Sequence, residues 1–106
     1  MKQEIKEHHR TDANGTPTGG ISVGIGISVQ WQNGALGRGD ERKAPNGAFV
    51  EDVIQVALGR IEFYQSSKFA CPENAEAAEH LKLALAALGR RTAEREARAV
   101  EGTHTV

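Results

Sequence analysis

The sequence has a single cysteine, no long apolar run and no excess of charge of one sign, and each absence excludes a class of protein. Cys71 has no partner for an internal disulfide among the 106 residues, which favours a reducing compartment such as the cytoplasm. Without a charged-then-apolar leader or a long hydrophobic stretch, neither export nor a membrane span is expected. The formal net charge of −1 argues against binding of the whole chain to nucleic acid or to an acidic membrane.

Signatures of catalysis and of metal binding are also lacking. No Ser-His-Asp arrangement and no metal-ligand spacing can be assembled from the sequence. His8 and His9 are adjacent, so a strand would place them on opposite faces, and we interpret them as surface residues rather than as ligands of one metal. Cys71 precedes a proline in a predicted turn and is interpreted as a small buried residue rather than a nucleophile. We therefore expect a binding protein, not an enzyme, with no metal and no cofactor.

The residues that are present divide the chain into two halves. Nine of the twelve glycines fall between Gly15 and Gly47, and the second half is rich in alanine and helix-like. The length suits one domain. The predicted fold class is α+β, with an N-terminal antiparallel β-hairpin or sheet packed with two long C-terminal helices in an oligomer. Its parts are a β region over 1–32, a mobile loop over 33–47, two helices over 48–98 and a tail over 99–106.

The stretch GISVGIGISVQWQNG, residues 20–34, superficially resembles a nucleotide-binding glycine loop. Gly24 and Gly26 have the first spacing of such a loop, but Val29 stands where the third glycine is needed. Read with period two, the stretch predicts one long strand with its apolar residues on one face. These are Ile21, Val23, Ile25, Ile27, Val29 and Trp31. The opposite face of serine and glycine predicts close approach of another segment, a subunit or a ligand. An Asn14-Gly15 turn before it predicts a hairpin.

Two helices are predicted after the glycine-rich loop. Asn46 is a suitable N-cap for a first helix from Phe49 to about Gln65. A second apolar stripe on this helix, Phe49, Val56 and Phe63, predicts that it covers the sheet and meets a further surface. The second helix is predicted from Glu73 to about Arg98. At about 39 Å it is longer than a domain of this size can cover, so its C-terminal end should overhang. The Arg38-Gly39-Asp40 tripeptide of the loop is attributed to chance.

An arginine stripe is the most informative feature of the second helix. The inward positions Leu81, Ala84 and Leu88 continue, at the same spacing, as Arg91, Arg95 and Arg98. Guanidinium groups match phosphate and carboxylate oxygens and stack on planar rings. The alternative is a solvated helix end with Arg91–Glu94 and Glu94–Arg98 surface pairs.

Aromatic residues gather at the other end of the predicted helix pair. Phe63, Tyr64 and Phe69 lie near the first helix's end, and Asn74 heads the second. In antiparallel helices these residues would lie far from Arg91 and Arg95 of the same chain, but a two-fold axis would bring them together. The arrangement suggests a site between subunits, with an aromatic platform, an amide that reads a base edge and arginines for phosphates. Phe63 and Phe69 could alternatively be core residues.

Three segments together resemble a known family. GGISVGIGISVQWQNG, NGAFVEDVIQVALGRIEFYQ and RRTAEREARAVEGTH are similar to the first family of Thoeris anti-defence proteins of bacteriophages, over about Gly19 to His104. The resemblance implies a non-enzymatic sponge that sequesters cyclic ADP-ribose signals made by bacterial TIR-domain enzymes. It also implies action in the cytoplasm of the infected bacterial host, and binding of cyclic di- and trinucleotides at separate sites of a hexamer.

The resemblance also implies site residues. They are an aromatic residue at the end of the first helix, Phe63 or its neighbour Tyr64, with Asn74, Arg91 and Arg95. The chain departs from the family pattern in three places. Ala35 stands in place of proline, AEAAEHLK is more polar than usual, and Ala99 replaces glycine.

Three rival functions remain open at this point. The first is an enzyme that cleaves the same nucleotide. The second is a small structural or interaction protein, in which the glycine-serine face and the second apolar stripe serve only oligomerisation. The third is nucleic-acid binding through the arginine stripe, against which the flanking glutamates and the net charge of −1 argue.

Overall fold

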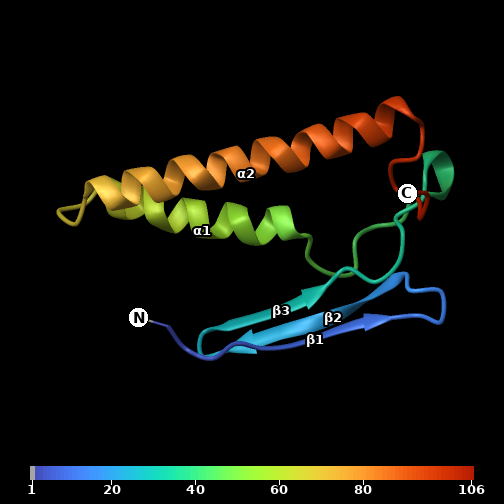
Figure 1. Cartoon of the computed structure of the whole chain (residues 1–106), viewed down its shortest axis with the longest axis horizontal. Helices are drawn as coiled ribbons and strands as arrows, with labels where there is room; N and C mark the ends of the chain where they lie inside the picture. Colours follow the sequence, from blue (N-terminus) through green and yellow to red (C-terminus); the bar gives the residue numbers. More distant parts are fainter. Residues whose placement is uncertain (1) are drawn as a thin grey trace. The chain divides into compact units, whose positions relative to one another are not determined.

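The computed structural model describes residues 2–106, which form two compact units (Figure 1). The first unit contains the N-terminal part as far as Phe49 and also the tail from Val100 to Val106. The second unit is the segment Val50–Ala99. The α+β prediction is confirmed, because a three-stranded antiparallel sheet precedes two helices in the chain.

The sheet of the first unit has the order β1-β2-β3, with β1 at Lys6–Thr11, β2 at Pro17–Gly24 and β3 at Ile27–Trp31. The predicted turn before β2 is present. The Asp12 carboxylate accepts hydrogen bonds from the backbone N–H of Asn14 at 2.8 Å and of Thr16 at 3.1 Å. Gly15 has a φ of +79°, which glycine adopts without steric cost.

The prediction of one continuous strand through residues 21–31 is wrong. The chain reverses at Ile25 and Gly26, because Gly24 pairs with Ile27 across a two-residue loop. Gly26 has a φ of +77° there. The Gln3 side chain holds the loop, since its amide donates to the Ile25 carbonyl at 2.8 Å and accepts from the Ile25 N–H at 2.7 Å. Gly24 is thus the last residue of β2, and Gly26 lies in the turn that leads to β3.

The reversal also changes the composition of the two faces. Ser22 lies opposite Val29 and Gly20 lies opposite Trp31 in the β2–β3 pairing. The apolar residues of β3 therefore share a face with the small residues of β2, so the six apolar residues do not form one face as predicted. On the predicted serine-glycine face, close approach of another segment is found at Gly24, where a Cβ would lie 2.7 Å from Ile5 Cδ1 and 2.8 Å from Gln3 Oε1.

The loop after β3 is closed by side-chain amides. The Asn46 amide donates to the Asn33 carbonyl and accepts from the Asn33 N–H, both at 2.9 Å. Gln32 accepts from the Asn46 N–H at 2.8 Å, and a short parallel bridge joins Trp31 to Ala48. Asn46 is therefore not the N-cap of the first helix, because its side chain is bonded to Asn33, four residues before that helix begins in the sequence.

The C-terminal tail is bonded to the same loop. Glu101 accepts two hydrogen bonds from the Arg42 guanidinium, at 2.8 and 3.0 Å, and its carbonyl accepts one from Arg38 at 2.9 Å. The Gly37 N–H donates to the Gly102 carbonyl at 2.7 Å. A Cβ on Gly102 would lie 2.3 Å from the Gly37 carbonyl oxygen. We call these contacts between residues 37–42 and 101–102 the loop–tail latch.

The second unit is a helical hairpin of α1, Val50–Gln65, and α2, Pro72–Ala97 (Figure 1). Pro72 opens α2, one residue before the predicted start at Glu73, and its fixed φ suits the first turn of a helix. The most buried hydrophobic side chains of the described residues are Leu58 of α1 and Ala78 of α2. The Gln65 amide closes the connection, accepting from the Cys71 N–H at 3.0 Å and donating to its carbonyl at 3.1 Å.

The last helix ends in an unfavourable backbone conformation. With 26 residues against 16, α2 extends about 15 Å further than α1, as predicted. Arg98 caps α2, and Ala99 then adopts a φ of +60° while its N–H donates to the Glu96 carbonyl at 2.9 Å. Glycine is the residue that usually occupies this position.

Candidate functional site

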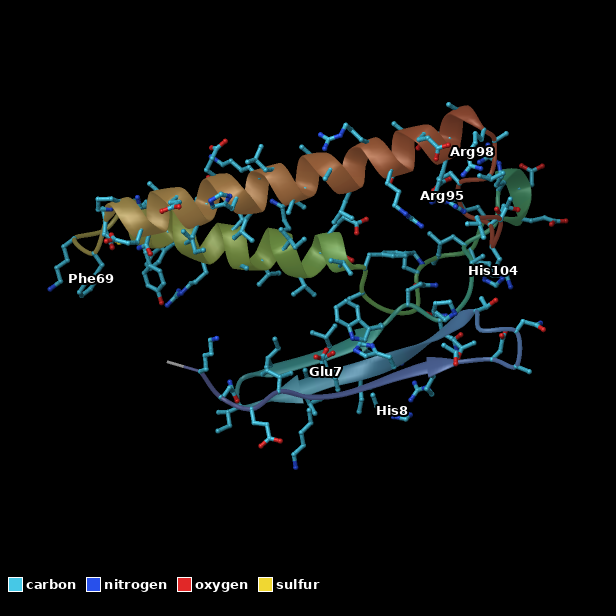
Figure 2. All side chains as sticks on the ribbon, viewed as in Figure 1. Glu7, His8, Phe69, Arg95, Arg98 and His104 are labelled. Atoms are coloured by element: carbon cyan, nitrogen blue, oxygen red, sulfur yellow. The ribbon has the colours of Figure 1, made fainter. Side chains whose placement is uncertain are left out.

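The helical hairpin carries all the predicted site residues, at two separate ends. Phe63 and Tyr64 lie in the last turn of α1 and Asn74 in the first turn of α2, whereas Arg91 and Arg95 lie in the last two turns of α2. Figure 2 shows Phe69 in the connection between the helices and Arg95 at the far end of α2. About 26 Å of helix separates Asn74 from Arg91. One chain therefore does not bring the two groups together.

The aromatic end contains a residue that the sequence analysis missed. Arg60 lies over both rings, with its guanidinium carbon 5.0 Å from the Phe63 centroid and 4.9 Å from the Tyr64 centroid. Its Nε–H donates to the Tyr64 hydroxyl at 3.2 Å. The signal that could have revealed Arg60 is its spacing, since residues three and four apart are neighbours on a helix.

The alternative that Phe63 and Phe69 are core residues is wrong. Phe63 is 56% exposed and Phe69 is 66% exposed. The Lys68 ammonium lies 5.4 Å from the Phe69 ring, and the Phe69 N–H donates to the Ser67 hydroxyl at 3.1 Å. Both rings are accessible to a ligand or a partner.

The arginine end is polar and charged. Arg91 is exposed, Arg95 is half-buried, and the inward stripe continues beyond Leu88 through Thr92, whose hydroxyl donates to the Leu88 carbonyl at 3.2 Å. Of the surface pairs predicted here, Glu94–Arg98 is present. Arg91 and Arg95 are one turn apart, so both can contact the same anionic group.

Large apolar side chains are also exposed on both helices. Val56 is 75% exposed on α1, seven residues before Phe63, and Leu83 is 55% exposed on α2. These positions include two of the three residues of the predicted second stripe. Such surfaces mark interaction sites when they are contiguous.

The sheet carries a polar cluster that has the residue types of a catalytic site but not its geometry. The Ser22 hydroxyl donates to Glu7 Oε2 at 2.8 Å and accepts from the Trp31 indole N–H at 2.8 Å. His9 Nε2 lies 3.3 Å from the same Glu7 oxygen. Ser22 is only 5% exposed, and its hydroxyl oxygen already accepts the Trp31 N–H, so the hydroxyl is not presented to a substrate. The cluster joins the three strands.

The two histidines of β1 lie as predicted. His9 pairs with Gly20 and His8 with Ile21, so their side chains project from opposite faces. Figure 2 shows the same alternation for Glu7 and His8. Within residues 2–106, no three His, Cys, Asp or Glu side chains are grouped closely enough to hold a metal ion. No helix in that range has both the length and the hydropathy needed to cross a membrane.

A comparison with known protein families identifies the family to which this chain belongs. The Acb2/Tad1 hairpin-domain model matches residues 27–93, well over half of the chain. The chain belongs to the Acb2/Tad1 hairpin-domain family. The matched region begins at β3 and includes the loop, α1 and most of α2, so it contains Phe63, Tyr64, Asn74 and Arg91. Arg95 and the tail lie beyond its end.

A curated relative supports the assignment. The chain is similar to a protein of Bacillus phage SBSphiJ7 named Thoeris anti-defense 1, with 51% identity over 59 residues. The alignment covers 56% of this chain and 42% of the phage protein. The match therefore spans less than half the length of the curated relative.

Proposed function

We propose that this family member is a phage anti-defence protein that binds and sequesters cyclic ADP-ribose-type signalling nucleotides without degrading them. Membership of the Acb2/Tad1 family and the similarity to a protein named Thoeris anti-defense 1 support an anti-defence role. The proposed place of action is the cytoplasm of the infected bacterium. Cyclic di- and trinucleotides are proposed as further ligands.

The observation that carries the proposal is the division of the site between the two ends of the hairpin. Tyr64 or Phe63, with Asn74, offers an aromatic face and an amide, and Arg91 with Arg95 offers two cations. A planar base with a pyrophosphate needs both groups at once. Two hairpins related by a two-fold axis would place the aromatic end of one beside the arginine end of the other.

Self-assembly is therefore part of the proposed function. The exposed Val56 and Phe63 of α1 and Leu83 of α2 supply apolar area for a second copy to cover. We propose a homodimer as the unit that completes the site, and a hexamer built from such dimers as the larger assembly.

Sequestration needs slow release rather than chemistry. Charge-assisted hydrogen bonds from Arg91 and Arg95 to a pyrophosphate, together with stacking on an aromatic ring, would lower the dissociation rate. Closure of the 33–47 loop over the ligand stays a prediction. In the structure that loop is bonded to the tail through Glu101, so closure would require the loop and the tail to move together or the latch to open.

The test is recovery of the ligand. The purified protein is mixed with cyclic ADP-ribose isomers, filtered, and the filtrate is chromatographed before and after heating. A nucleotide that disappears and returns unaltered on denaturation is the expected result. A new product would identify an enzyme instead, and no depletion would favour the rival function, an oligomeric structural protein.

The variant Arg95→Ala should abolish ligand retention while the protein stays folded and oligomeric. It removes one of the two cations proposed to bind the pyrophosphate, and with it the charge-assisted hydrogen bonds proposed to slow release. The measurement is the same filtration assay, with circular dichroism and sedimentation as controls. Unchanged retention would remove Arg95 from the site.

A further inference from the structure

Arg60 and the two aromatic side chains at the end of α1 form one cluster, in which the arginine is central. The guanidinium carbon lies about equally far from the Phe63 and Tyr64 ring centroids, at 5.0 and 4.9 Å, and the Nε–H donates to the Tyr64 hydroxyl at 3.2 Å. The two rings are tilted by 55° with centroids 6.0 Å apart. Arg60 therefore restrains the orientation of both rings.

The cluster remains accessible in spite of these contacts. Phe63 and Tyr64 are both among the exposed large side chains, and Arg60 is exposed as well. A guanidinium has five N–H donors in a planar fork, and the Tyr64 hydroxyl accepts one of them. The end of α1 thus presents an aromatic surface and a cation side by side.

We propose that Arg60 is a positioning and ligand-contacting residue of this site. It holds the Tyr64 ring in place, and its terminal N–H groups bind an acceptor on the base edge or a phosphate of a purine nucleotide stacked there. Arginine makes such contacts in a plane, both to base-edge acceptors and to phosphates. The inference rests on the proposed function, to which it adds a third arginine, at the aromatic end rather than the far end of α2.

The structure offers a matched control in the neighbouring pair. Lys68 also lies over an exposed ring, with its ammonium 5.4 Å from the Phe69 centroid. It occurs at the same end of the hairpin and carries the same charge as Arg60. Lysine lacks the planar guanidinium, however. If ligand release depends only on positive charge at this end of the hairpin, a Lys68 variant should also change the release rate. If it depends on the planar guanidinium, only the Arg60 variants should.

The experiment compares the release rate of cyclic ADP-ribose from the intact oligomers of wild type, Arg60→Ala, Arg60→Lys and Lys68→Ala. We expect both Arg60 variants to release the ligand about tenfold faster or more, and Lys68→Ala to stay within about twofold of wild type. In ¹H–¹⁵N spectra, the Arg60 Nε–H signal should carry a ring-current shift that Tyr64→Leu reduces, since the Phe63 ring remains. A merely structural role would change thermal unfolding instead.

Each outcome decides the inference. Release from Arg60→Ala at the wild-type rate would overturn the role of Arg60 and leave the proposed function intact. Wild-type release from Arg60→Lys would show that charge alone suffices and would overturn the planar contact. If the wild type retains no ligand, the proposed function fails and the inference fails with it. Should Arg60→Ala not fold, the comparison uses Arg60→Lys, which keeps the charge and a good helix former.

Discussion

At the scale of single residues, several side chains have roles that their identity alone does not reveal. Asparagine often caps the N-terminus of a helix, yet the Asn46 amide is hydrogen-bonded to the Asn33 backbone across the loop. Such a bond joins residues 13 apart in the sequence and has no periodic signature, so sequence analysis could not distinguish it from a cap. The aromatic residues of the proposed site stand out in the sequence by type and position, whereas Arg60 was missed because an arginine on a helix is ordinarily a solvated surface residue.

Ala99 gives a prediction at this scale. Its φ of +60° lies in the left-handed region, where glycine is the usual residue after a helix. A Cβ in this conformation costs roughly 1 kcal/mol or more. Ala99→Gly should therefore raise the free energy of unfolding by about 0.5–1 kcal/mol and the Tm by about 5 °C, measured by thermal denaturation.

Its matched control is an alanine in the middle of the same helix. Ala86 is exposed within α2, where glycine costs about 1 kcal/mol of helix stability. Ala86→Gly should lower the Tm. If both variants lowered it, Ala99 would not be strained.

At the scale of elements, the hairpin of β2 and β3 shows that alternation of apolar residues does not reveal a tight turn between two strands. Apolar residues alternate through residues 21–31 without a break, which predicts one strand. A two-residue loop does not interrupt this alternation, but it exchanges the faces, because Ile27 comes to lie opposite Gly24. Only the loop residues could signal the turn, and Ile25-Gly26 is not among the dipeptides that usually do so. The helices were predictable within one or two residues because their periodicity is long.

The loop–tail latch gives a prediction for the 33–47 loop. Glu101→Gln keeps the size of the side chain but removes its charge, weakening the paired hydrogen bonds from Arg42 by roughly 1 kcal/mol. Local opening should become about fivefold more frequent. Trypsin should then cleave after Arg38, Arg42 and Lys43 about fivefold faster, measured by mass spectrometry of timed digests.

The control is a second glutamate whose ion pair lies elsewhere. Glu94 pairs with Arg98 within the last turn of α2 and its cap, so Glu94→Gln should leave cleavage in the loop unchanged. Equal digestion of wild type and Glu101→Gln would show that the latch does not hold the loop.

At the scale of the whole molecule, the main feature is how little apolar surface one chain buries. Leu58 and Ala78 are the buried hydrophobic side chains among the described residues, while Val56 and Phe63 stay exposed. Burying an exposed valine contributes about 1.5–3 kcal/mol, so covering the stripe would stabilise an assembly considerably. The sequence indicated a second apolar stripe, but no pattern within one chain identifies the partner that covers it.

Assembly is tested at Val56. Val56→Lys should weaken self-association about tenfold or more, because a charged group would have to be buried in the proposed interface. Sedimentation at a series of protein concentrations measures the effect. Gln55→Lys changes the adjacent exposed residue and should leave the assembly intact. A Val56→Lys protein that associates like wild type would contradict the proposed interface.

The loop–tail latch also has a consequence for the order of folding. The turns of the sheet and the helical hairpin join residues close in sequence, whereas the latch joins residues 59 to 63 apart through Arg42, Arg38 and Glu101. Contacts of high sequence separation form late, after loop-closure entropy has been reduced by local structure. On the ribosome, residues 101–102 of the latch emerge after the sheet and both helices. The sheet and the helical hairpin can therefore form before the latch closes, and its closure adds the tail to the first unit.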